Sequence, residues 1–346
     1  MLMTIRTFLG GSRRVAGIGT LALLVLVVSL AGCGASAGSN TTASSPTKLT
    51  VGLTYVPNIQ FAPFYVAQAL GYYRDAGLAV TFHHHGPGED EFGALVAGKE
   101  DAIFASGDEV AQAGAHNVPV VDVATVFTRY PVVVIVPANS SIHSAADLRG
   151  HTIGVPGAYG ATYIGLLSLL SSAGLSKSDV TVQSIGYTQV TALLTHKVDA
   201  VMGYANNEPL LLQKAGMSVR TLDVNNTEHP LVSNGLAAMQ SELSSHGDAM
   251  KKLVAATLKG VQYVLEHPQE AVNLSKSFVP GLANASNAED ALAVLQATLP
   301  MMQTNGPKAG YNDPAKWTAM VSFLQAQGQL AGPVDATKLY SNDYLP

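Results

Sequence analysis

The sequence contains a single cysteine, Cys33, among its 346 residues. No disulfide can form within one chain, and a cysteine-ligated zinc or iron–sulfur site is excluded as well. Charge is also sparse, because Asp, Glu, Lys and Arg make up only 12% of the residues, and the formal net charge is −5. The chain therefore lacks the basic surface that nucleic acids require, so DNA and RNA are excluded as partners.

The body of the chain, from Leu49 onward, also lacks the familiar catalytic motifs. It has no Gly-x-Ser-x-Gly elbow and no Walker lysine, and Ser106 precedes Gly107 without an evident histidine partner. The loop Gly154–Gly160 does not have the dinucleotide-binding spacing; its amides could hold a ligand oxygen, or it is a plain strand-to-helix turn. We expect no catalytic residue, no cofactor and no enzyme activity.

The first 33 residues have the pattern of an export signal. Arg6, Arg13 and Arg14 precede an apolar run of roughly 16 residues from Val15 to Leu30. This run is shorter than the ~20 residues that span a bilayer, and it ends in small residues, as signal peptides do. Residues 1–32 are therefore predicted to be a signal peptide, although the export route (Sec or twin-arginine) stays open.

The segment Leu-Ala-Gly-Cys33 resembles the bacterial lipobox. This resemblance implies that Cys33 is lipidated and becomes the mature N-terminus, on the extracytoplasmic face of the cell membrane. Residues 33–48 are rich in Ser, Ala, Thr and Gly and cannot bury enough apolar surface to order themselves, so we expect a flexible tether.

The body alternates short apolar strands with helices. A strand is expected at Leu49–Tyr55, a helix at Phe61–Asp75 and a strand at Leu78–His83, and a similar series restarts at Thr152. Gly98-Lys-Glu-Asp-Ala-Ile-Phe and His196-Lys-Val-Asp-Ala-Val-Met repeat one pattern in the two halves. This alternation predicts an α/β protein with two lobes, each a mostly parallel sheet flanked by helices.

Ligands of open α/β sheets bind beyond the carboxyl ends of the strands, so we expect a cleft between the lobes. The loops at those ends are rich in tyrosine, amides and glycine, and only one arginine, Arg129, falls in them. Tyrosines in loops either pack against their neighbours or hold a planar ring between their faces. The lack of cations favours a neutral or weakly charged ring compound. The candidate ligand-binding residues are Tyr55, Asn58, Phe61, Ser106, Tyr130, Tyr159, Tyr187, Tyr204, Asn207 and Glu208.

The three consecutive histidines His83-His84-His85 suggest a metal-binding site. Neighbours on a strand face opposite sides, so at most His83 and His85 could share one ion, with oxygens from Glu89, Asp90 or Glu91. We expect a solvated strand end here and no metal site.

The segment Tyr55-Val-Pro-Asn-Ile-Gln-Phe-Ala-Pro-Phe-Tyr-Val-Ala-Gln-Ala-Leu-Gly-Tyr-Tyr-Arg-Asp-Ala-Gly-Leu78 resembles substrate-binding proteins of ABC importers in the thiamine-pyrimidine-synthesis-like family. Ala146–Gly150, Ile185–Gln189 and Asp199–Pro209 look similar too. With Gly203-Tyr-Ala-Asn-Asn-Glu-Pro, the chain looks most like the riboflavin-binding branch. Enzymes of the family carry a cysteine-rich motif that is missing here.

The resemblance implies a two-lobe periplasmic-binding-protein fold of type II. We place the first part of lobe 1 at 49–137, lobe 2 at 138–231, and the return to lobe 1 with the C-terminal helices at 232–346. It also implies a lipid-anchored protein that captures riboflavin and delivers it to an ABC permease with its ATPase. A thiamine pyrimidine precursor is the alternative ligand, and a secreted enzyme or an adhesion or sensory module are the alternative functions.

Overall fold

The computed structural model describes residues 45–86, 89–225, 229–304 and 306–346. The predicted signal peptide, the lipidation site Cys33 and most of the predicted tether lie outside these residues. Residues 45–346 form one compact unit. Among the described residues, no helix combines the length and the apolar character needed to cross a membrane.

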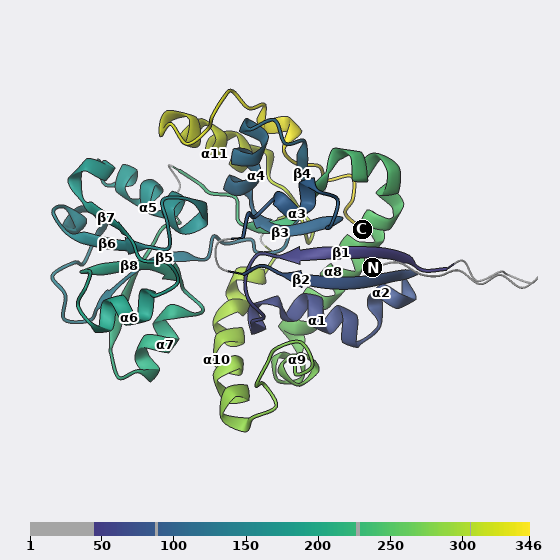
Figure 1. The fold of residues 1–346 in the computed structure, drawn as a ribbon, viewed down its shortest axis with the longest axis horizontal. Coiled ribbons are helices and arrows are strands. Elements are labelled where there is room, and N and C mark those ends of the chain that lie inside the picture. Colours follow the sequence, from purple (N-terminus) through teal and green to yellow (C-terminus); the bar gives the residue numbers. More distant parts are fainter. Residues whose placement is uncertain (1–44, 87–88, 226–228, 305) are drawn as a thin grey trace, which may run out of the picture. The chain divides into compact units, whose positions relative to one another are not determined.

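Two five-stranded sheets organise this unit, and each belongs to one lobe (Figure 1). The first has the order β2 (Leu78–His84), β1 (Thr47–Leu53), β3 (Ala102–Ser106), β10 (Asn234–Met239) and β4 (Val120–Thr125). The second has the order β7 (Thr181–Ser184), β6 (Thr152–Val155), β8 (Ala200–Tyr204), β5 (Val132–Pro137) and β9 (Val219–Asp223). The predicted two-lobe α/β architecture is confirmed.

Each sheet is mixed, with one strand that runs against the others. That strand is β10 in the first sheet and β5 in the second, and each is antiparallel to both of its neighbours. The other pairs, β1 with β2 and β3, and β6 with β7 and β8, are parallel. The reversed strand is in each case the first one after the chain has changed lobes.

The chain enters the second sheet earlier than the expected boundary at Pro137. Val132–Pro137 pairs with β8 and β9, so the first crossing lies between Thr125 and Val132. The chain returns between Asp223 and Asn234. A fully apolar strand such as Val132–Pro137 does not reveal which of two apolar sheets it joins, and this explains the difference.

The repeated sequence pattern corresponds to the same pair of aspartate hydrogen bonds in both lobes. Asp101 precedes β3, its Oδ2 accepts a hydrogen bond from the Thr50 amide at 2.6 Å, and its own amide donates to the Thr50 carbonyl at 2.8 Å. Asp199 precedes β8 and makes the same two bonds with Thr152, at 2.8 and 2.9 Å. Asp101 thus fixes the start of β3 against β1, and Asp199 fixes the start of β8 against β6.

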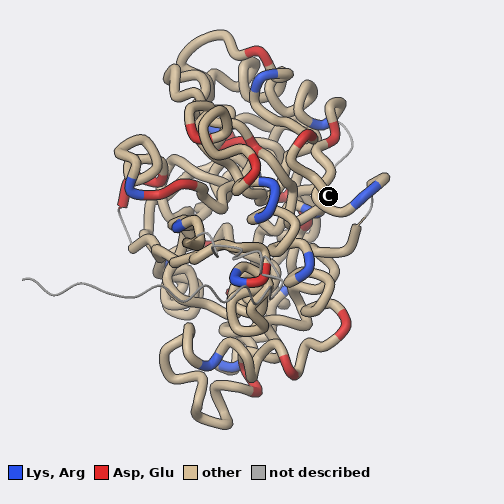
Figure 2. The backbone as a smooth tube through the Cα atoms, turned by 90° about the vertical axis from the view of Figure 1, so that its right-hand side faces the viewer, with Lys and Arg blue, Asp and Glu red and all other residues tan. Residues whose placement is uncertain are grey.

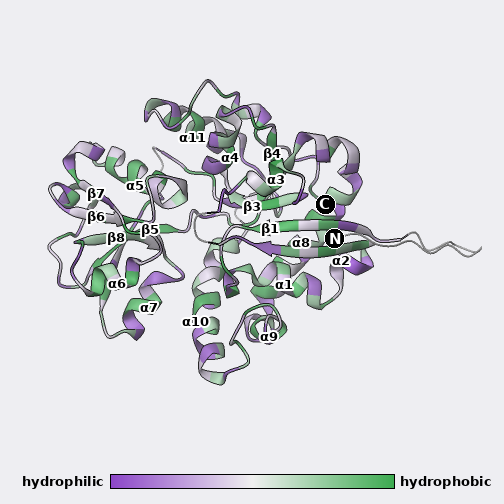
Figure 3. Ribbon diagram, in the orientation of Figure 1, coloured by the Kyte–Doolittle hydropathy of each residue, from purple (hydrophilic) through white to green (hydrophobic). Residues whose placement is uncertain are grey.

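Helices cover both sheets, whose strands are mainly hydrophobic (Figure 3). The helices are α1 (Ala62–Ala69), α2 (Tyr72–Asp75), α3 (Gly93–Val96), α4 (Gly107–Ala115), α5 (Gly160–Ser172), α6 (Gln189–Leu194), α7 (Glu208–Lys214), α8 (Gln240–Glu266), α9 (Pro268–Leu274), α10 (Ala285–Met302) and α11 (Pro314–Ala326), with short 3-10 turns at Ile59–Phe61, Ala145–Leu148, Lys177–Asp179 and Ala336–Lys338. In the first lobe, α1 packs against the long helix α8, α4 contacts β4, and α11 packs on α4. In the second lobe, α5 contacts β5 and α6 contacts β8.

A buried polar cluster fastens the C-terminal segment to the first sheet. The side chain of Asn312, which is fully buried, accepts hydrogen bonds from Thr125 Oγ1 at 3.0 Å and Trp317 Nε1 at 2.9 Å. Its Nδ2 donates to Asp122 Oδ1 at 2.8 Å. Burial raises the pKa of Asp122 to about 7. One amide therefore serves three buried partners from β4 and α11.

Candidate ligand-binding site

A cavity of about 300 Å³ opens between the two lobes, a volume at the lower end of the range for small-molecule sites. Its walls come from loops at the carboxyl ends of strands in both sheets, as expected for open α/β sheets. The lining residues are Thr54, Tyr55, Gln60, Phe61, His85, Gly86, Glu89, Asp90, Glu91, Phe104, Glu109, Phe127, Pro156, Tyr159, Gly160, Ala161, Thr162, Tyr187, Gln189, Tyr204, Asn207, Glu208 and Asn234.

Three phenylalanines form a rigid apolar wall on the side of the first lobe. Phe61 packs edge-on against Phe104 with ring centroids 5.9 Å apart, and Phe104 packs edge-on against Phe127 at 5.4 Å. All three rings are almost completely buried. Phe61 ends the 3-10 turn that begins after Asn58, whose side chain accepts a hydrogen bond from the Gln60 amide at 3.0 Å. This cap aims Gln60 and Phe61 toward the cavity.

Tyrosines supply the rest of the aromatic surface, and they come from both lobes. Tyr55 follows β1 and Tyr187 follows β7, and their rings meet edge-on at 5.6 Å across the cavity. Tyr187 is 46% exposed and Tyr159 is 62% exposed. Large apolar rings at that exposure are not core packing, so their faces are available to a ligand.

Seven of the ten candidate residues line this cavity, namely Tyr55, Phe61, Tyr159, Tyr187, Tyr204, Asn207 and Glu208. The other three, Asn58, Ser106 and Tyr130, do not line it. Asn58 caps the 3-10 turn, and Ser106 caps α4 in a capping box with Glu109. Tyr130 is 2% exposed, and its hydroxyl can donate to Asp108 Oδ1 or the Ala161 carbonyl, each 2.9 Å away. Their polar groups are used within the protein.

The cavity also contains residues that the sequence analysis did not select. Phe104 and Phe127 lie in or next to apolar strands, so nothing in the pattern distinguishes them from the core. Glu109 belongs to the segment Ser106-Gly-Asp-Glu109, which is typical of a capping box, so helix capping alone explains its presence. Gln60 and Gln189 stand in the loops that were expected to carry the site.

Glu109 and Glu208 occupy equivalent places in the two lobes. Glu109 Oε2 accepts a hydrogen bond from the amide of Ser106, the last residue of β3, at 2.8 Å. Glu208 Oε2 accepts one from the amide of Tyr204, the last residue of β8, at 2.7 Å. Glu109 Oε1 also accepts a weaker bond from the Ala161 amide at 3.3 Å, which links the two lobes. Two carboxylates are thus held at fixed points on opposite walls.

The described lining residues include no lysine or arginine. Basic positions form only short, separate stretches of the chain (Figure 2). Burial raises the pKa of Glu208, and burial together with the neighbouring Glu109 raises the pKa of Glu91. A ligand that carries phosphate or carboxylate groups would find no counter-ion here, whereas hydroxyl and amino groups would find acceptors.

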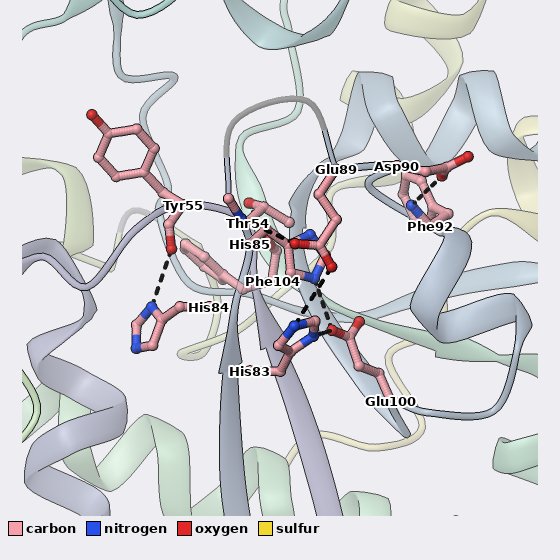
Figure 4. Close-up of polar contacts among 11 residues, drawn as sticks. Thr54, Tyr55, His83, His84, His85, Glu89, Asp90, Phe92, Glu100 and Phe104 are labelled. Carbon is pink, nitrogen blue, oxygen red and sulfur yellow. Dashed lines mark hydrogen bonds and ion pairs between the residues drawn. The ribbon is translucent and has the colours of Figure 1, made fainter.

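Of the three consecutive histidines, His85 differs from the expected solvated strand end (Figure 4). His85 is only 5% exposed, and its Nε2 lies 2.7 Å from Glu100 Oε1. His84 points to the other side of β2, where its ring nitrogens lie within hydrogen-bond distance of the Tyr65 hydroxyl and the Tyr55 carbonyl. His85 is buried because β1 and Glu100 lie beside it, whereas the His83 side chain is 43% exposed.

Comparison with known proteins assigns the chain to a family. A family model described as NMT1/THI5 like matches residues 58–271. The chain belongs to this family. Riboflavin-binding protein RibY of Chloroflexus aurantiacus is 37% identical over 307 residues, which cover 86% of each sequence. The formylaminopyrimidine-binding protein of Halalkalibacterium halodurans is 27% identical over 338 residues, which cover 93% of this chain and 97% of that protein.

Solved structures confirm the fold. The periplasmic aliphatic sulphonate binding protein SsuA from Escherichia coli superposes with a TM-score of 0.67 and 18% sequence identity, over 85% of this chain and 92% of that chain. At that identity the likeness concerns the fold alone. The predicted periplasmic-binding-protein fold is confirmed, and the relatives support a role in binding a small molecule.

Proposed function

We propose that this protein is the solute-binding component of an ABC import system and that its ligand is riboflavin. The observation that carries this proposal is a cavity between two lobes that is lined by tyrosine rings from both lobes, with exposed rings at Tyr159 and Tyr187 in the second lobe and no lysine or arginine among its described lining residues. The 37% identity to a riboflavin-binding protein supports the same ligand. Closure of the lobes on the ligand would present it to a permease.

The chemistry of riboflavin matches the surfaces of the cavity. Its tricyclic ring is flat and uncharged, so it gains from aromatic faces and needs no counter-ion. Its dione edge offers acceptors and an N–H donor, which the side-chain amides of Gln60, Gln189 and Asn207 can pair. The hydroxyls of its polyol chain are donors, and the carboxylates of Glu109 and Glu208 are acceptors at fixed positions.

A thiamine pyrimidine precursor is the second candidate ligand. It is favoured by the 27% identity to a formylaminopyrimidine-binding protein over most of both chains. The amino group of such a pyrimidine could donate to the same carboxylates. A single ring would, however, engage fewer of the tyrosines that line the two walls.

A fluorescence titration distinguishes the two ligands. Riboflavin fluorescence is quenched when its ring stacks on an aromatic side chain, so we expect saturable quenching with one site per chain and a dissociation constant below about 1 µM, which corresponds to about −8 kcal/mol. An aminopyrimidine precursor added in excess should not reverse the quenching. Absence of quenching by folded protein, with binding of the pyrimidine measured by calorimetry, would replace riboflavin with the alternative ligand.

We further propose that Cys33 anchors the protein to the extracytoplasmic face of the cell membrane. The lipobox-like sequence Leu-Ala-Gly-Cys33 supports this proposal. The Cys33→Ala variant should then move from the membrane fraction to the soluble fraction of cells, while Ser36→Ala should leave the protein with the membranes. A Cys33→Ala protein that still sediments with membranes would contradict the lipid anchor.

The proposed role is binding without catalysis, in partnership with a permease and its ATPase. The hydroxyl of Ser106 is buried and donates to Glu109 Oε2 at 2.7 Å, so it is not presented to a ligand as a nucleophile. Recovery of a permease and an ATPase with the detergent-solubilised protein would support the import role. An adhesion or sensory module would have neither partner.

A further inference from the structure

Two histidines and one glutamate converge at the edge of the first sheet (Figure 4). His83 lies in β2 and His85 directly follows the last residue of that strand, and two positions apart in extended chain their side chains leave the same face. His83 Nδ1 lies 2.6 Å and His85 Nε2 lies 2.7 Å from the same atom, Glu100 Oε1. The three potential ligand atoms all lie within 4.8 Å of one another.

A glycine makes room for this cluster. Gly52 lies in β1, between β2 and β3, and is aligned with His83 in the sheet register. A Cβ atom at this position would lie 2.3 Å from Glu100 Oε2 and 2.6 Å from Glu100 Oε1. No other residue could occupy the position without displacing the carboxylate. The local sequence therefore admits Glu100 into the space beside the two imidazoles.

The hydrogen bonds within the cluster leave the carboxylate incompletely satisfied. The Glu100 side chain is fully buried, and its Oε2 has no hydrogen-bond partner. Both histidines approach the other oxygen, Oε1. A buried carboxylate oxygen without a hydrogen-bond partner raises the free energy of the folded protein unless a positive charge lies beside it. Two neutral imidazoles and one carboxylate are, on the other hand, a donor set that suits a divalent metal ion.

We propose that His83, His85 and Glu100 form a binding site for a divalent transition-metal ion of the Zn²⁺ class. The ligand atoms are His83 Nδ1, His85 Nε2 and Glu100 Oε1, and water would fill the fourth position of a tetrahedral site. Two imidazole nitrogens favour Zn²⁺ over Ca²⁺ or Mg²⁺, which prefer oxygen ligands. This site adjoins the proposed riboflavin site, because His85 and Glu89 also line the cavity, whereas His83 and Glu100 do not.

A second carboxylate lies beside one of the histidines, on the side away from Glu100. Glu89 Oε1 lies 3.5 Å from His83 Nε2, the ring nitrogen that faces away from Glu100. Glu89 Oε2 accepts a hydrogen bond from the Gly86 amide at 3.0 Å, which fixes the carboxylate. A carboxylate behind a ligating imidazole is the usual second layer of a zinc site, because it orients the ring and raises its basicity.

The cluster needs only a small expansion to accept the ion. Ligands at the usual 2.0–2.1 Å from zinc lie about 3.3 Å apart in a tetrahedron, compared with 2.6 and 2.7 Å for the two observed pairs. The side chain of His83 is 43% exposed, so it can move outward by this amount without disturbing the core.

Zinc binding can be measured directly on protein made without a polyhistidine tag and treated with a chelator. Zn²⁺ titrated in competition with a chromophoric zinc indicator should bind at one ion per chain. We expect the His83→Ala and Glu100→Gln variants each to lose at least tenfold in affinity. The matched control is His246→Ala, which removes an exposed imidazole that lies 2.9 Å from a carboxylate oxygen of Glu242; its affinity should equal that of the unchanged protein.

Thermal unfolding provides a readout in which folding defects are visible. Zn²⁺ should raise the melting temperature of the unchanged protein and of His246→Ala, but not that of His83→Ala. If Glu100→Gln fails to fold, the half-exposed His83 position decides the test. The proposal is overturned if the unchanged protein binds no Zn²⁺ at one equivalent, or if both cluster variants bind it as tightly as the control.

Discussion

Replacing Tyr187 with alanine is expected to weaken riboflavin binding ten- to a hundredfold. The ring of Tyr187 is 46% exposed and meets Tyr55 edge-on at 5.6 Å, so it offers a face to the cavity without serving the core. Loss of one stacking aromatic costs about 1–3 kcal/mol, by analogy with stacking on nucleic acid bases. Flavin fluorescence titration of the variant measures the change.

Tyr55→Ala should cause a loss of similar size, and the two losses should not be additive. The rings touch, so removing one also changes the surface that the other presents to the ligand. Tyr311→Ala is the matched control, because Tyr311 is a half-buried tyrosine outside the cavity lining. If Tyr55→Ala and Tyr187→Ala both bind riboflavin like the unchanged protein, the site has been placed wrongly.

Asn312→Ala is expected to lower the free energy of unfolding by about 3 kcal/mol or more. The substitution removes the shared partner of Thr125 Oγ1, Trp317 Nε1 and Asp122 Oδ1, all of which are buried. Each buried polar group left without a partner costs about 1–3 kcal/mol. Because these groups join β4 to α11, the C-terminal helix should loosen first. Chemical denaturation followed by circular dichroism measures the loss.

A surface asparagine provides the comparison for this effect. Asn287 donates one hydrogen bond to the Gly281 carbonyl at 3.0 Å and is exposed, so Asn287→Ala should cost less than about 1 kcal/mol. Equal stabilities of the two variants would mean that the buried cluster contributes little and that the C-terminal segment is held by apolar packing alone.

The two-lobe fold could be predicted because local patterns and a repeat agreed. Strand-like runs alternate with helix-like runs, and the turns at Asp101 and Asp199 recur because both aspartates bind the backbone of a neighbouring strand in the same way. The lobe boundary near Pro137 could not be placed, because Val132–Pro137 is apolar on both faces and suits either sheet.

The loops that carry the site could be predicted, but not the direction of every side chain in them. Tyr130 and Tyr187 both lie in strand-end loops, yet Tyr130 turns inward to Asp108 while Tyr187 remains exposed. Only the packing around each loop distinguishes them. The burial of His85 likewise depends on Glu100 and Gly52, which are remote in sequence and meet it only through the order of strands in the sheet.

The most direct test of the proposed ligand and of its site is the crystal structure of the protein grown with riboflavin. The account predicts the flavin ring in the cavity between the lobes, in contact with Tyr55 and Tyr187, and the polyol hydroxyls within hydrogen-bond distance of Glu109 or Glu208. A flavin bound outside this cavity, or a cavity that stays free of flavin while a pyrimidine precursor occupies it, would contradict the account.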